Sequence, residues 1–78
     1  MKIELFKMLE DAANSDKSKA LLTLSLLSDH PAGIGDHSTE DFYKNAEAAL
    51  LLLAESQDRL EAIDIYLSEA SNNKELLT

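Results

Sequence analysis

Residues 30–38 read His-Pro-Ala-Gly-Ile-Gly-Asp-His-Ser and decide the fold. They contain the only proline of the chain, both glycines and both histidines. Proline cannot continue a helix, and glycine tolerates the backbone angles that tight turns require. Because helical patterning lies on both sides of this stretch, the sequence predicts a turn at residues 29–38 that joins two helical arms.

The second arm is predicted to be one long helix over residues 39–71. Two hydroxyl residues, Ser38 and Thr39, come directly before a pair of acids, which is the composition of a helix N-terminus. From there small or apolar residues recur at alternating intervals of four and three, as in a coiled-coil seam. No glycine or proline interrupts the pattern, and residues 74–78 are expected to fray. The seam consists of Phe42, Ala46, Ala49, Leu53, Ser56, Leu60, Ile63, Leu67 and Ala70.

The first arm is predicted to be helical over residues 3–28, with one ambiguity. Apolar residues share a face on either side of a wholly polar stretch at residues 14–19. This arm is therefore either two short helices, broken near residues 14–18, or one helix with a hydrated middle. Continuity is favoured because neither glycine nor proline forces a break. The apolar residues are Ile3, Phe6, Leu9 and Ala13 before the polar stretch, and Ala20, Leu24 and Leu27 after it.

Leucines in the middle of both arms indicate self-association. Four successive leucines at residues 50–53 point around the whole helix, because each residue turns it by about 100°. One partner helix covers only one stripe of such a surface. Two hairpins packed together would form an antiparallel four-helix bundle, so the sequence predicts a homodimer. The predicted interface residues are Leu24, Leu27, Leu50, Leu51, Leu53 and Leu60.

Composition supports a single small domain over residues 1–78. A chain of this length buries little core on its own, and it has no cysteine for disulfides, which leaves oligomerisation as a route to stability. The net charge of −8 is unfavourable for binding nucleic acid or anionic membranes. No apolar stretch is long enough to span a bilayer, and no apolar signal region is visible. We therefore expect a cytoplasmic protein.

Acidic residues are predicted to lie mostly away from the seam and to face solvent. Glu55 and Arg59 stand four residues apart in the order that favours an ion pair within one helix. Tyr43 and Tyr66 lie off the seam, and we expect them to be partly buried. A different interpretation of the acidity is a decoy that imitates DNA and binds a basic host protein.

The corner also contains potential metal ligands, namely His30, Asp36 and His37. Imidazole and carboxylate groups bind divalent ions, but this spacing matches no standard metal motif. The favoured interpretation is turn architecture, with a metal-binding corner as the alternative. No nucleophile, base and orienting group recur in a catalytic pattern, and no cofactor motif is present. The sequence thus predicts a non-enzymatic structural or protein–protein interaction module without a cofactor, which binds itself and a further protein not identified by the sequence.

The corner, together with Glu55-Ser-Gln-Asp-Arg-Leu-Glu61, resembles short helical proteins of marine and T4-like bacteriophages. The resemblance covers residues 28–62, and its specific part is the HPxGIGDHS corner. It implies a phage origin, and with it a location in the host cytoplasm, and carries no activity, cofactor or binding residue.

Overall fold

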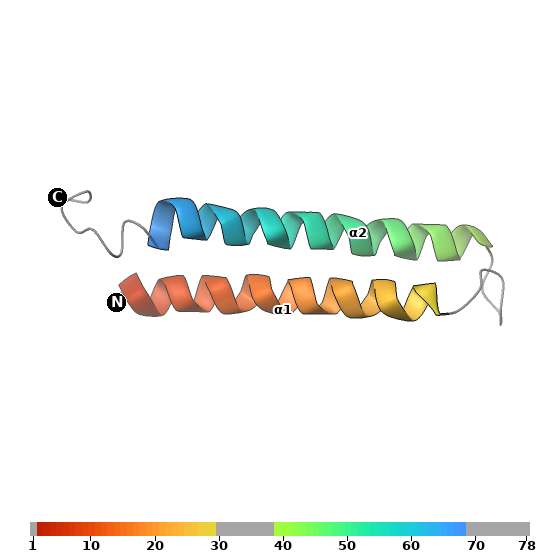
Figure 1. Ribbon diagram of the computed structural model, residues 1–78, viewed down its shortest axis with the longest axis horizontal. Helices are drawn as coiled ribbons and strands as arrows, with labels where there is room; N and C mark the ends of the chain where they lie inside the picture. The colour runs from red at the N-terminus through yellow and green to blue at the C-terminus, as the bar shows by residue number, and fades with distance from the viewer. Residues whose placement is uncertain (1, 30–38, 69–78) are drawn as a thin grey trace.

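A computed structural model, which describes residues 2–29 and 39–68, shows two long helices side by side and antiparallel (Figure 1). Helix α1 spans Lys2–Ser28 and helix α2 spans Thr39–Ala62. A π-helix, η1 (Ile63–Ser68), continues directly from α2. The all-α prediction is confirmed, and the described residues contain no strand. The predicted corner lies outside the described residues.

Helix α1 is continuous through the polar stretch at residues 14–19. The alternative of two short helices is therefore wrong. Asp16 and Lys17, in the middle of this stretch, are half-buried rather than hydrated. Lysine has a helix propensity close to that of alanine, and the stretch has no glycine or proline that would interrupt the backbone hydrogen bonds of the helix. Its 27 residues make α1 about 40 Å long.

The end of α1 satisfies two of its last backbone carbonyls locally. The Ser28 hydroxyl donates to the carbonyl oxygen of Leu24 at 2.7 Å, and the Asp29 amide donates to that of Ser25 at 3.2 Å. The Ser25 carbonyl belongs to the last turn, whose carbonyls have no partner within the helix, so the Asp29 amide supplies a partner from just beyond the helix end. The helix ends three residues before Pro31, which agrees with the predicted boundary.

Helix α2 packs its predicted seam against α1. Every described member of the seam is buried or half-buried, so this prediction is confirmed; Ala70 lies outside the described residues. The predicted helix differs in one respect, because its last described turns form the π-helix η1. Hydrogen bonds there run from residue i to i+5, which widens the turn. Ile63 and Leu67, four residues apart, both stay on the side of α1, one buried and one half-buried.

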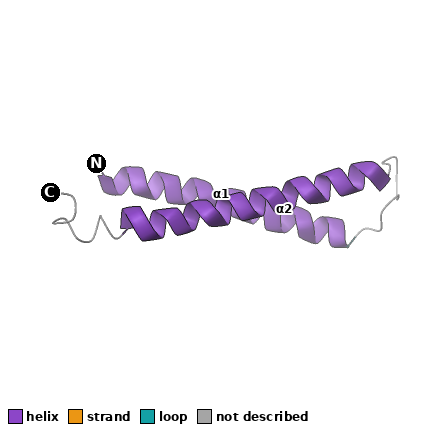
Figure 2. Ribbon diagram, turned by 90° about the horizontal axis from the view of Figure 1, so that it is seen from above, coloured by secondary structure: helices purple, strands orange, loops and turns teal. Residues whose placement is uncertain are grey.

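Small side chains occupy most of the fully buried positions between the helices. Ala13, Ala20 and Ser56 are almost completely inaccessible to solvent, and Ala49 is also buried. Ile63 is the single large apolar residue that is buried among the described residues. Figure 2 shows that the two helices cross each other rather than running strictly parallel. Alanine and serine allow two helix backbones to approach closely, so the hairpin is held by a narrow core.

Residues away from this core are more exposed than the sequence suggested. Ile3, predicted to share the apolar face of α1, is largely exposed at the beginning of the helix. Tyr43 and Tyr66 are also exposed, so the prediction that they are partly buried is wrong. The Tyr43 ring stands edge-on to that of Phe42, with the ring centres 6.0 Å apart. The second tyrosine extends from η1, beyond the narrow core.

Candidate interaction surface

The leucine-rich middle of the hairpin lies largely in solvent. Leu50 is 58% exposed and Leu51 is 66% exposed, whereas the next two leucines, Leu52 and Leu53, are half-buried. On α1, Leu21, Leu22 and Leu26 are exposed as well. One hairpin thus covers only part of the apolar surface of each helix, as the pattern predicts. Large contiguous apolar patches on a small protein mark interaction sites.

One face of the hairpin carries an open groove of about 340 Å³ between the two helices. We call this side of the molecule the groove face. Three of the lining residues come from α1 and four from α2, so the groove follows the line along which the helices meet. It is lined by Ala20, Thr23, Leu27, Asn45, Ala48, Ala49 and Leu52. The lining is mostly apolar and small, which suits the side chains of another helix.

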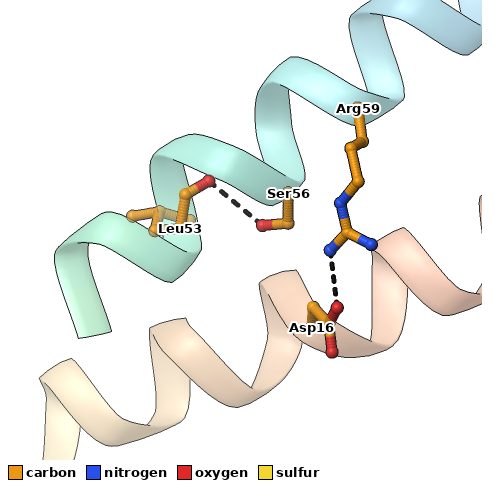
Figure 3. A network of polar contacts seen from close by, with 4 residues as sticks. All are labelled: Asp16, Leu53, Ser56 and Arg59. Carbon is orange, nitrogen blue, oxygen red and sulfur yellow. Dashed lines mark hydrogen bonds and ion pairs between the residues drawn. The ribbon is translucent and has the colours of Figure 1, made fainter. Parts of the chain in front are cut away.

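A polar contact ties the two helices together beside the narrow core (Figure 3). Arg59 Nη2 of α2 donates to Asp16 Oδ2 of α1 at 2.5 Å. The two side chains are 40% and 31% exposed, so the pair is only partly screened by water. Arg59 Nε is buried and has no hydrogen-bond partner. Asp16 therefore joins α1 to α2 at one point along the antiparallel pair.

This contact replaces the ion pair predicted within α2. Arg59 was expected to bind Glu55, and that prediction is wrong because its guanidinium group reaches across to the other helix. The sequence held a signal for the observed pair. Asp16 lies three residues after Ala13 and four before Ala20, which is the position that the seam of α1 requires. A carboxylate at that position looked like a break in the seam, although it is the partner of an arginine.

Ser56 adds a second polar group to the contact, without linking the helices (Figure 3). Its side chain is completely buried, and its hydroxyl donates to the carbonyl oxygen of Leu53 at 3.0 Å in the same helix. The hydroxyl is thereby satisfied within α2, which removes most of the cost of burying it. The small size of the Ser56 side chain lets the two helices pack closely at this position.

The predicted interface residues fall into two groups. Leu24, Leu27, Leu53 and Leu60 are half-buried and belong to the contact between α1 and α2. Leu50 and Leu51 are exposed and remain available to a partner. The leucine row of the sequence therefore serves both the packing inside the hairpin and the surface outside it.

The potential metal ligands His30, Asp36 and His37 lie outside the described residues. Within residues 2–29 and 39–68, no three histidine, aspartate or glutamate side chains gather into a group that could hold a metal ion.

The carboxylates of α2 do not form an unbroken row. Between Glu47 and Glu55 the exposed positions are taken by alanine and leucine. A decoy that imitates DNA would need regularly spaced negative charge there.

Comparisons with protein-family models, with curated proteins and with solved structures found no match to this chain. None of the described helices is long and apolar enough to cross a membrane.

Proposed function

We propose that this chain is a non-enzymatic protein–protein interaction module that works as a homodimer, in which two hairpins form an antiparallel four-helix bundle. The observation that carries the proposal is the distribution of apolar side chains. Small residues take most of the fully buried positions between α1 and α2, while Leu26, Leu50 and Leu51 lie more than half exposed. A folded chain usually has the opposite arrangement, with its large aliphatic side chains inside.

Energetics support a second copy as the partner. Full burial of an exposed leucine contributes about 1.5–3 kcal/mol, and a 78-residue chain with a narrow core has little stability to spare. A hairpin of two long antiparallel helices has the shape that pairs into a four-helix bundle with short connections. A twofold dimer would bury the exposed leucines on one face of both copies at once.

Measurement of mass in solution tests the proposal. Size-exclusion chromatography with light scattering at micromolar concentration should give twice the 8.6 kDa of one chain. The melting temperature should rise with protein concentration, because association stabilises the folded state by mass action. A mass of one chain, together with a melting temperature that does not depend on concentration, would rule the homodimer out.

A further inference from the structure

We infer that the second copy docks on the groove face, about a twofold axis parallel to the helices, so that α1 of one copy lies against α2 of the other. This inference rests on the proposed homodimer and names the surface and the geometry that it uses. The first line of support is the pattern of exposed residues that borders the groove on each helix.

On α1, the positions beside the groove repeat at intervals of seven. Ala12, Lys19 and Leu26 are all exposed, and Lys19 and Leu26 flank the groove residue Thr23 at distances of four and three along the helix. On α2, Ala48, Glu55 and Ala62 repeat at the same interval and are also exposed. Residues seven apart lie on one stripe of a helix. Each helix thus presents a second stripe beside the one that packs within the hairpin.

The register of the hairpin brings these two stripes to matching heights. The Arg59 side chain reaches Asp16, and Thr23 lines the groove together with Ala48 and Ala49, so these residues lie within about one helical turn of each other along the hairpin. Lys19 lies three residues after Asp16, and Glu55 lies four before Arg59, so in an antiparallel pair they also stand within about one turn of the same height. The same offset relates Leu26 to Ala48, and Ala12 to Ala62.

A twofold axis parallel to the helices preserves these heights. It places the α1 stripe of one copy over the α2 stripe of the other. Lys19 then faces Glu55 of the other copy, Leu26 sits over the small side chain of Ala48, and Ala12 meets Ala62. The charge pair, the large-on-small contact and the small-on-small contact each occur twice in the dimer. No ion pair or hydrogen bond occupies the side chains of Lys19 and Glu55 among the described residues of a single hairpin.

The opposite face does not offer the same match. There Leu21 is exposed on α1 and Leu50 on α2, and both stay exposed in the dimer that we infer. Glu10 on α1 and Asp64 on η1 stand at similar heights by the same contacts. A copy docked on that face by the same symmetry would set these two carboxylates against each other, and like charges repel. Charge therefore selects the groove face.

Two leucines of α1 provide a matched pair of variants. Leu26 is 52% exposed on the groove face, and Leu21 is 48% exposed on the opposite face. Leu26→Glu should raise the dissociation constant of the dimer about tenfold or more, because it removes a buried leucine from each copy and buries a charge. Leu21→Glu should leave the dissociation constant within about twofold of the wild type. Sedimentation equilibrium measures both values, and circular dichroism verifies that each variant remains helical.

Cross-linking tests the geometry in a dimer that keeps all its leucines. The chain has no cysteine, so Lys19→Cys and Glu55→Cys each introduce a single thiol. The two single variants are mixed, with one of them labelled with ¹⁵N, and treated with a short bismaleimide. The mixed product should dominate over either homodimeric product. The control mixture of Glu10→Cys and Asp64→Cys should give no such excess.

The outcomes separate this inference from the proposed homodimer. A monomeric wild-type chain would overturn both. A dimeric wild type would leave the function standing and overturn the docking geometry if any of three results appeared: dissociation by Leu21→Glu, an intact dimer with folded Leu26→Glu, or Lys19→Cys cross-linking to itself in preference to Glu55→Cys.

Discussion

The contact between α1 and α2 and the groove face use the same two helices in opposite ways. Inside the hairpin, Ala13, Ala20, Ala49 and Ser56 are buried, and only Ile63 among the large apolar residues joins them. On the outside, leucines from the middle of both helices are exposed. Small side chains let the two backbones lie close together but bury little apolar area. They therefore determine the position of the helices more than they stabilise the fold.

This difference explains why the hairpin forms and why it leaves apolar surface exposed for association. A narrow core of alanines sets the position of the two helices, and the ion pair between Asp16 and Arg59 joins them at one point. Part of the apolar area that would stabilise such a small chain lies on the surface that we assign to a second copy. Variants that alter one of the two regions should therefore differ in both the kind and the size of their effects.

The largest effect is expected from a charge placed within the hairpin. Leu53→Asp puts a carboxylate at a half-buried seam position, where it has no partner and its desolvation costs several kcal/mol. We expect loss of most of the helical signal in circular dichroism at 25 °C. The neighbouring Ala54→Asp, at an exposed position, should retain that signal. Equal melting curves for the two variants would mean that the seam does not pack as described.

Overfilling the narrow core should have the next largest effect. Ala20→Leu adds three carbon atoms at a position that is 1% exposed, which should force the helices apart and cost about 1–3 kcal/mol in urea unfolding. Ala54→Leu makes the same change on the surface and should alter the free energy of unfolding by less than about 0.5 kcal/mol. Ala20→Leu would be harmless only if the two helices were further apart than this structure has them.

These two predictions depend on features that the sequence revealed well. The seam of α2 was visible because its positions keep one spacing for more than three heptads without interruption. The α1 seam was partly hidden, since Asp16 and Lys17 occupy its middle and a polar stretch in a helical pattern resembles a boundary. Local spacing indicates which residues share a face, and this was enough to predict two antiparallel helices.

The pairing of residues between helices was much harder to predict. Arg59 has an acid four residues before it in its own helix and another across the hairpin, and sequence spacing reveals only the first. Choosing between them requires the register of the hairpin, which depends on the corner and on the packing of alanines. The groove face could not be predicted for the same reason. It combines residues from two helices, and their register relative to each other cannot be read from the sequence.

The contact between Asp16 and Arg59 should give a smaller effect that can be separated from packing. A double-mutant cycle with Asp16→Asn and Arg59→Met should yield a coupling of about 0.5–1 kcal/mol that weakens with added salt, because the pair is partly exposed. The same cycle on Lys7 and Asp11, an exposed pair 3.9 Å apart within α1, should give a smaller value. Equal couplings would mean that Arg59 contributes nothing beyond an ordinary surface pair.

The smallest effect is expected at the most deeply buried polar group. Ser56→Ala removes a hydroxyl whose only hydrogen bond goes to Leu53 in its own helix, so the change should shift the free energy of unfolding by less than about 0.5 kcal/mol. Alanine also favours the helix more than serine does, which offsets the lost bond. Ser56→Leu, in contrast, should destabilise like Ala20→Leu. A cost above about 1 kcal/mol for Ser56→Ala would show that the hydroxyl bonds across the hairpin, and the contact would then be specified by polarity as well as by size.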